Sequence, residues 1–232
     1  MNSVQKNQLL SADDAIVSRR SIRAFLPDEI PRATIEEILR VASRAPSGSN
    51  TQPWKVYVLT GGAKQRLVEA LVGAYDDPDQ SKYVPEYSYY PEQWVSPFQD
   101  RRRKVGWDLY QLLGLTRENK AGMAAQHRKN FEFFGAPVGL MFTISSVMSK
   151  GSWLDYGMFL QAIMTAARAR GLDTCPQAAF VNYSEVIRGE LQLPPEEAFV
   201  CGMALGWEDK SHIENSLQSE RVPVAEFAQF LS

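Results

Sequence analysis

Three arginines and a serine lie within five residues near the amino terminus, in Arg19-Arg20-Ser21-Ile22-Arg23. A guanidinium group is permanently charged and binds two phosphate oxygens at once, and a serine hydroxyl adds a neutral donor. If the backbone is extended here, Arg19, Ser21 and Arg23 point to one face. The alternative is a solvated helix end, because arginines in a last turn complement the helix dipole. The spacing alone leaves both a phosphate site and a charged surface open.

A second polar segment, from Pro46 to Trp54, reads PSGSNTQPW. Its amide side chains, Asn50 and Gln52, each donate and accept hydrogen bonds, which suits the mixed edge of a heteroaromatic ring. The alternative is an ordinary loop between a helix and a strand, because the same residue types are typical of turns. These residues alone do not decide between a ligand-binding loop and a connecting loop.

A third segment, from Gly171 to Gln177, reads GLDTCPQ. A glycine that ends a helix leads into a polar turn, whose backbone N–H groups either face a ligand or close a loop around a buried cysteine. Cys175 has no paired histidine visible in the sequence, so a nucleophilic role is not expected. The segment is therefore a candidate for ligand binding through its backbone.

Helices and a few strands must position these segments, and hydrophobic periodicity predicts where they lie. Helices are predicted at Ser11 to Arg20, Thr34 to Arg44, Ala63 to Tyr75, Lys104 to Leu113, Ala121 to Phe134, Ser152 to Arg170 and Val224 to Leu231, and strands at Lys55 to Thr60, Val138 to Ile144 and Ala198 to Trp207. Ser11 is expected to cap the first helix, and Thr34 with Glu37 forms a capping-box pattern at the second. Helices around a small sheet define an α+β or α/β layered domain.

The helix predicted at Ser152 to Arg170 is apolar on most of its sides, including Leu154 and Met158. A helix that is apolar all round is typical of a protein's interior. We therefore expect this helix at the centre of the molecule.

Composition narrows the class of protein. The 232 residues are 44% hydrophobic and 22% charged, which excludes an intrinsically disordered chain and suits a single folded domain over residues 1–232. The 25 basic and 27 acidic residues give no basic excess, so no nucleic-acid partner is expected. Two cysteines, Cys175 and Cys201, and two histidines show no metal-ligand spacing. Residues 1–10 lack the apolar core of a signal peptide, so a soluble, cytoplasmic protein without a membrane partner is expected.

With these segments in this order, the chain resembles the flavin-dependent nitroreductase family over nearly its whole length. The segments that carry the resemblance are RRSIRAF at 19–25, APSGSNTQPW at 45–54, GLDTCPQ at 171–177, GMALGW at 202–207, and the terminal Arg221-Val222-Pro223. The resemblance implies a three-layer α/β/α fold of class α+β, with a mostly antiparallel sheet. It also implies an intertwined homodimer, whose carboxyl-terminal tail extends to the partner subunit and which binds one FMN in each of two interface sites.

The resemblance further implies a role for each matching residue. It assigns Arg19, Arg20, Ser21 and Arg221 to the flavin phosphate, Arg23 to N1 and O2 of the flavin ring, Pro46, Ser47, Gly48, Asn50 and Gln52 to the site of the other subunit, and Thr174, Cys175, Pro176 and Gln177 to a turn with a backbone donor for N5. Some relatives have a second basic residue two positions before the terminal arginine, where this chain has Ser219. The phosphate must then rely on the remaining arginines.

The function implied is the reduction of nitroaromatics, quinones or similar flat acceptors by NADH or NADPH through FMN, in a ping-pong hydride mechanism. A fixed cation near N1 and O2 stabilises the reduced flavin, so no catalytic residue beyond the flavin contacts is expected. A related reductive flavoenzyme, such as a dehalogenase or an enone reductase, is an alternative within the same fold. A flavin-binding protein without turnover is an alternative of a different class.

Residues 76–103 break the periodic pattern with four prolines and are predicted to form a lid-like excursion. Six aromatic residues gather there: Tyr83, Tyr87, Tyr89, Tyr90, Trp94 and Phe98. Aromatic rings stack on flat substrates, and Tyr89, Tyr90, Trp94 and Phe98 are the candidates for that contact. The alternative is that several of the six anchor the loop to the core. The basic run at 101–104 that follows is either a solvated helix start or a site that attracts an acidic acceptor or the phosphates of the nicotinamide cofactor.

Overall fold

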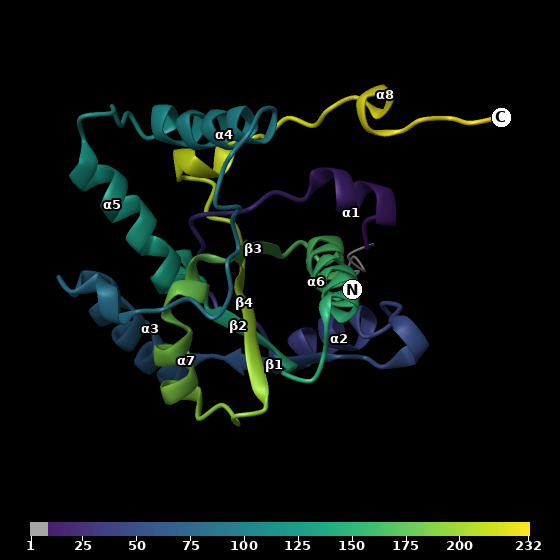
Figure 1. Ribbon diagram of the computed structural model, residues 1–232, viewed down its shortest axis with the longest axis horizontal. Coiled ribbons are helices and arrows are strands. Elements are labelled where there is room, and N and C mark those ends of the chain that lie inside the picture. Colours follow the sequence, from purple (N-terminus) through teal and green to yellow (C-terminus); the bar gives the residue numbers. More distant parts are fainter. Residues whose placement is uncertain (1–8) are drawn as a thin grey trace, which may run out of the picture.

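A four-stranded sheet forms the middle layer of the molecule (Figure 1). The computed structural model describes residues 9–232. Most of the segment 1–10, for which no signal peptide is predicted, therefore lies outside the described residues. The strands are β1 (Trp54–Leu59), β2 (Val138–Ser145), β3 (Asp173–Gln177) and β4 (Glu197–Gly206). They lie in the order β1-β2-β4-β3, and every pairing is antiparallel. The predicted α+β class with an antiparallel sheet is confirmed.

Strand β3 corrects the sequence analysis, which expected a polar turn at Thr174 to Gln177. Pairing with β4 makes this segment an edge strand. Proline has no backbone N–H to donate, and Pro176 is tolerated because an edge strand is paired on one side only. The chain after α1 covers its outer side, since the Ile22 N–H donates to the Thr174 carbonyl oxygen at 3.1 Å. The arginine-rich segment and the 171–177 segment therefore lie side by side.

Helices cover both faces of the sheet, which confirms the predicted three layers. On one face, Leu140 and Phe142 of β2 share a core with α2 (Arg32–Ala42) and α6 (Lys150–Ala169). On the other face, Met141 of β2 shares a core with α3 (Gly61–Asp76) and α7 (Ser184–Leu191). Alternate residues of β2 thus enter opposite layers, as strand geometry requires.

The remaining helices lie at the periphery, and several of their ends differ from the prediction. These helices are α1 (Ala12–Ser18), α4 (Phe98–Leu112), α5 (Lys120–Arg128) and α8 (Val224–Phe227). The Asp14 N–H donates to Ser11 Oγ at 3.1 Å, which confirms the predicted cap of α1. The capping box at Thr34 is wrong, because α2 begins at Arg32 after Pro31 and Thr34 already lies within the helix.

Two further boundaries bear on the functional region. Helix α4 begins at Phe98, inside the predicted excursion, so the irregular segment is 77–97 with a single turn of 3₁₀ helix at Gln80–Lys82. Helix α5 ends at Arg128, and a 3₁₀ stretch continues it to Gly135. Within residues 9–232, no helix has the length and apolar character needed to cross a membrane.

Helix α6 is not enclosed by this chain, in contrast to the expectation of a central helix. Tyr156, Phe159 and Ile163 are buried against the sheet. Leu154 and Met158 lie on another side of the helix and are 74% and 41% exposed. One chain therefore leaves an apolar face of α6 in contact with water.

The glycines of the GMALGW segment serve close packing. A Cβ at Gly202 would lie 2.4 Å from the Phe180 ring, and a Cβ at Gly206 would lie 2.8 Å from the Phe25 ring. Both rings therefore rest directly on the β4 backbone, which explains why this segment contains glycine at these two positions.

Candidate functional site

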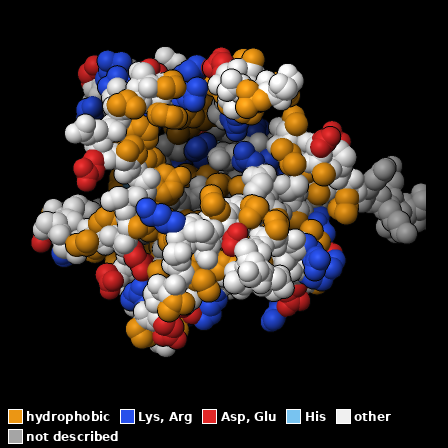
Figure 2. Space-filling model, turned by 45° about the vertical axis from the view of Figure 1, so that its right-hand side comes forward, with side chains coloured by type: hydrophobic (Ala, Val, Ile, Leu, Met, Phe, Trp, Pro, Cys, Tyr) orange, Lys and Arg blue, Asp and Glu red, His pale blue; other side chains and the backbone are white. Residues whose placement is uncertain are grey.

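The extended chain after α1 places three of the predicted site residues on one face. Ile22 is fully buried, while Arg19, Ser21 and Arg23 line a cavity of about 960 Å³, which we call the arginine cavity. The other charged residues that line it are Arg20, Arg168 and Arg221. The view in Figure 2 shows a hollow in the molecular surface with Lys and Arg side chains inside it. Arg19, Ser21 and Arg23 thus line one cavity as predicted, but Arg20 lines it as well, so the segment does not alternate strictly.

Only some of these arginines are neutralised by carboxylates. Arg20 Nη2 lies 2.9 Å from Glu208 Oε1, and Arg168 Nη1 lies 3.0 Å from Asp173 Oδ1. Among residues 9–232, Arg19 and Arg221 take part in no ion pair. Burial, and after it the nearby charge of Arg221, lowers the pKa of Arg19. Two guanidinium groups held near each other without a counter-ion are suited to bind an anion.

Arg221 reaches this cavity from the carboxyl-terminal tail. Lys104 of α4 lies 3.3 Å from Glu220, which holds the tail against the helix. Arg221 Nη1 donates to Ser219 Oγ at 2.8 Å. The serine at this position therefore positions Arg221 and adds no second charge of its own.

Arg23 joins the arginine cavity to a second cavity. Its backbone N–H donates to Asn215 Oδ1 at 2.7 Å, and its Nη1 donates to the Ser21 carbonyl oxygen at 3.0 Å. Arg23 lines both cavities. The two cavities are therefore parts of one elongated site, with a fixed cation at their junction.

The second cavity, of about 510 Å³, lies between β3 and the 77–97 segment; we call it the tyrosine cavity. Its lining includes Arg23, Cys175, Pro176 and Gln177, and the aromatic residues Tyr87, Tyr89 and Tyr90. Gln177 is 3% exposed, and its Nε2 donates to the Asn130 carbonyl oxygen at 2.7 Å. Gln177 Oε1 is buried without a hydrogen-bond partner, as is Thr174 Oγ1. A buried polar atom without a partner costs roughly 1 to 3 kcal/mol. Of these two residues only Gln177 lines the cavity, so its oxygen is the candidate for contact with a ligand there, while Thr174 lies outside the lining of both cavities.

Cys175 also lines this cavity but is chemically inert there. Burial raises the pKa of the Cys175 thiol to about 11, so the group stays protonated at neutral pH. This agrees with the expectation that Cys175 is not a nucleophile.

The aromatic residues of the 77–97 segment divide into two groups. The Tyr87 hydroxyl donates to the Val200 carbonyl oxygen at 2.6 Å, and the Tyr83 hydroxyl donates to Asp77 Oδ2 at 3.0 Å. These two residues anchor the segment. Tyr89 and Tyr90 line the tyrosine cavity with their rings 4.8 Å apart.

Two of the predicted substrate residues lie outside the lining of either cavity. Trp94 touches the Tyr90 ring, with centroids 5.4 Å apart, and so supports the cavity wall from behind. Phe98 is the first residue of α4 and is 58% exposed. Tyr89 and Tyr90 are thus the members of the predicted set that face the cavity directly.

The predicted contribution from the 46–52 segment is not brought to either cavity within one chain. The Gly48 N–H donates to Asp155 Oδ2 of α6 at 3.1 Å, so the segment rests beside the exposed face of α6. Ser49, Asn50 and Gln52 have φ angles of 50°, 57° and 48°. Left-handed backbone at three exposed non-glycine residues is strained and costs free energy within one chain. Pro46, Ser47, Gly48, Asn50 and Gln52 all belong to this loop.

Sequence reasoning missed Arg168, Glu208 and Asn215. Arg168 lies in the last turn of α6, shortly before the 171–177 segment. This proximity in the sequence could have identified it as a residue of the site. Glu208 and Asn215 lie far along the chain, and no local pattern links them to the arginine segment.

The chain matches the model of the Nitroreductase family over residues 16–207, and it belongs to that family. It is 43% identical to a 4-nitrobenzoate reductase of Pseudomonas putida over 94% of this chain and 95% of that protein. It superposes with a TM-score of 0.93 and 38% identity on an FMN- and NADPH-dependent nitroreductase, NfnB, of Sphigopyxis sp. strain HMH, covering 96% of this chain and 100% of the other. For the FMN-dependent nitroreductase NfnB of Mycobacterium smegmatis in complex with NADPH, the TM-score is 0.90 and the identity 32%, over 95% and 98% of the two chains.

Proposed function

We propose that this protein is an FMN-dependent NAD(P)H oxidoreductase that reduces nitroaromatic compounds, and also quinones or similar flat acceptors. The observation that carries the proposal is the elongated site, with unneutralised Arg19 and Arg221 at one end and the buried, unpartnered Gln177 Oε1 at the other. A molecule with a phosphate and a polar planar ring satisfies both ends. The named relatives support the same cofactor and the same class of acceptor.

Each residue of the chain has a defined task in this proposal. Arg19, Ser21 and Arg221 bind the phosphate, and Arg20 lies beside them with its charge balanced by Glu208. Arg23 places a positive charge against the ring and stabilises negative charge there on reduction. The strand residues Thr174, Cys175, Pro176 and Gln177 bind the ring edge. When bound, FMN supplies the hydride chemistry, while the protein orients the donor and the acceptor in turn.

The test is a spectrum and a kinetic assay of the purified protein. We expect a yellow protein that oxidises NADH or NADPH when 4-nitrobenzoate is added, with parallel double-reciprocal plots for donor and acceptor. Bleaching by the donor without turnover of any acceptor would identify a flavin-binding protein instead. Turnover confined to halogenated phenols or enones would identify one of the alternative reductive flavoenzymes.

We further propose that two copies of the chain complete the site. Leu154 and Met158 leave an apolar face of α6 exposed, and the strained 46–52 loop rests against the same helix. The apolar area and the loop are therefore both available to a second subunit. The loop of one subunit then supplies Asn50 and Gln52 to the cavities of the other.

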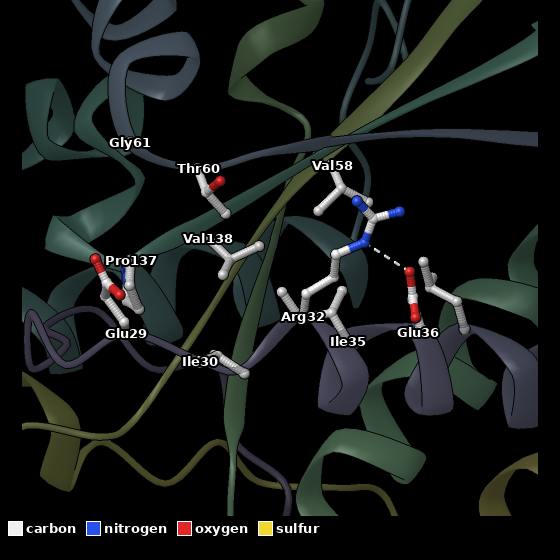
Figure 3. Close-up of a pocket in the computed structure, with 11 residues that line it drawn as sticks. Glu29, Ile30, Arg32, Ile35, Glu36, Val58, Thr60, Gly61, Pro137 and Val138 are labelled. Carbon is white, nitrogen blue, oxygen red and sulfur yellow. Dashed lines mark hydrogen bonds and ion pairs between the residues drawn. The ribbon is translucent and has the colours of Figure 1, made fainter.

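We propose that the carboxyl-terminal tail of the partner subunit binds beside the edge strand β1. A groove of about 560 Å³ lies beside the end of β1, between this strand and α2, and is lined by Ile30, Val58 and Val138, with an Arg32–Glu36 ion pair (Figure 3). The tail of this chain runs away from its own body (Figure 1), and Phe230 and Leu231 are 89% and 85% exposed. An open sheet edge has unpaired backbone groups, and the tail exposes apolar side chains to water. Binding of the tail at this edge would satisfy the former and bury the latter.

The dimer predicts a strong effect of charge on α6. We expect Leu154→Glu to convert the protein to monomers at micromolar concentration and to weaken FMN binding, because a carboxylate would be buried in the interface. Sedimentation velocity measures the first effect. Val84→Glu is the control, since Val84 is exposed but lies in the 77–97 segment. Unchanged sedimentation of the Leu154 variant would contradict this interface.

Two further expectations complete the proposal. We propose that residues 1–232 form one domain with the 77–97 segment as its lid, since the segment is tied to the domain by Tyr87 and covers the tyrosine cavity. Nicotinamide coenzymes are intracellular reductants, which supports a cytoplasmic location.

A further inference from the structure

The basic run at 101–104 is not used by the function proposed so far. Its four residues lie within the first two turns of α4, which begins directly after the 77–97 segment. Lys104 is paired with Asp108 at 2.8 Å and with Glu220 at 3.3 Å. Arg101, Arg102 and Arg103 take part in no ion pair among residues 9–232. Three adjacent cations therefore lack a counter-ion within the described part of the chain.

Arg102 differs from its neighbours because aromatic rings fix its position. Its Cζ lies 5.0 Å from the centre of the Trp94 ring and 5.4 Å from the centre of the Tyr90 ring. Cation–π contacts of this kind hold a guanidinium in place without neutralising its charge. Arg102 thus keeps a full positive charge and all of its hydrogen-bond donors for another group.

The same rings connect Arg102 to the site of reaction. Tyr90 lines the tyrosine cavity, and Trp94 supports the Tyr90 ring from outside the lining. The other end of this cavity is formed by Arg23 and the β3 residues that bind the flavin ring in the proposed function. Arg102 is therefore one aromatic ring away from the cavity in which the acceptor lies.

The charge of the cavity favours an anionic occupant. Its lining contains Arg23 and no Asp or Glu. Burial lowers the pKa of His127, which also lines the cavity, so this group is neutral at neutral pH. A carboxylate on the acceptor meets no repulsion here. Arg102 does not line the cavity, but a carboxylate that extends past the Tyr90 ring meets a planar, bidentate donor in it.

We propose that Arg102 is a specificity-determining residue that binds the carboxylate of an aromatic acceptor, so that this protein prefers nitrobenzoates to neutral nitroaromatics. The inference rests on the proposed function and narrows its substrate class. Trp94, which was a candidate for stacking on the substrate, then acts by holding Arg102 in position.

The experiment compares 4-nitrobenzoate with nitrobenzene, which has the same ring and nitro group but no charge. Holoenzyme of the wild type, Arg102→Gln and the neighbouring control Arg103→Gln is assayed with both acceptors and with NADH and NADPH. We expect Arg102→Gln to lower kcat/KM for 4-nitrobenzoate about tenfold, the size of one exposed charge-assisted contact. Nitrobenzene is expected to change less than about twofold, and Arg103→Gln to leave both acceptors unchanged.

A binding measurement separates recognition from turnover. Benzoate is not reduced, so its titration into the oxidised holoenzyme, followed by the flavin absorption band, reports binding alone. We expect its Kd to rise about tenfold in Arg102→Gln only.

The remaining outcomes overturn the proposal in distinguishable ways. Equal losses of kcat/KM with both acceptors mean that Arg102 supports the cavity wall and does not bind the carboxylate. A higher KM for NADPH, with NADH and 4-nitrobenzoate unchanged, means that Arg102 binds the 2′-phosphate of the donor. If the wild type reduces neither acceptor with either donor, the proposed function fails, and this inference fails with it.

Discussion

Replacement of Arg19 by alanine is expected to weaken FMN binding by about 100-fold. Hydrogen bonds to charged groups contribute roughly 1.5 to 3 kcal/mol, and about 1.4 kcal/mol corresponds to a factor of ten in Kd. Arg19 and Arg221 line the arginine cavity without a carboxylate partner in the described chain, as does Arg23 at its junction with the tyrosine cavity. Loss of Arg19 therefore removes one of the few unneutralised cations available to the phosphate.

Fluorescence titration measures this effect, because the emission of FMN is quenched when protein freed of flavin binds it. Arg66→Ala is the matched control, since Arg66 is exposed on α3 and does not line the arginine cavity. Arg19→Lys is expected to fall between the wild type and Arg19→Ala, because lysine keeps the charge but loses the bidentate geometry. If Arg19→Ala and Arg66→Ala bind FMN equally well, the phosphate does not lie in the arginine cavity.

The direction of the arginine side chains was predictable because it depends on local geometry alone. An extended strand alternates its side chains whatever its surroundings, so Arg19, Ser21 and Arg23 had to share a face. The charge balance of the cavity was not predictable in this way. Arg20 is neutralised by Glu208, which lies far along the chain, so only the folded structure separates it from the unneutralised Arg19.

Strand β3 shows where local patterns fail. The segment at 173–177 contains proline and polar residues, which favour a turn, yet its pairing with β4 makes it a strand. This error concerned the conformation and not the place, because the segment still lines the tyrosine cavity.

The aromatic residues of the 77–97 segment show a second limit of sequence. Tyr87 and Tyr89 are two positions apart and of the same type. Both line the tyrosine cavity, but Tyr87 also donates a hydrogen bond to the Val200 carbonyl oxygen. Whether a tyrosine also anchors a loop is set by such distant partners, which no local pattern shows.

Replacement of Glu197 by glutamine is expected to lower the thermal stability at neutral pH. The Glu197 side chain is 8% exposed at the end of the sheet that lies away from both cavities. Its Oε2 accepts hydrogen bonds from Thr143 Oγ1 at 2.6 Å and from the Tyr57 hydroxyl at 2.8 Å, and Lys55 is paired with its other oxygen. A glutamine keeps the shape but loses the charge that strengthens these bonds.

The loss is expected to be about 2 to 3 kcal/mol, because hydrogen bonds to a charged group contribute roughly 1.5 to 3 kcal/mol and the Lys55 pair is partly exposed. For a chain of this length, this corresponds to a decrease in Tm of roughly 5 to 10 °C. Circular dichroism of the FMN-loaded protein measures the decrease. Glu196→Gln is the control, since Glu196 is exposed next to it.

The pH dependence distinguishes the charge of Glu197 from its packing. Burial alone raises the pKa of this carboxyl, but the hydrogen bonds from Lys55, Thr143 and Tyr57 outweigh burial and leave the pKa below its ordinary value. A lowered pKa in the folded state stabilises the fold at pH values above the unfolded pKa of about 4.3, and the contribution is lost as the pH falls through the folded pKa. The difference in Tm between the wild type and Glu197→Gln should therefore have its largest value near neutral pH and disappear in acid. A difference that stays constant across this range would mean that the glutamine disturbs packing, and that the charge of Glu197 contributes nothing.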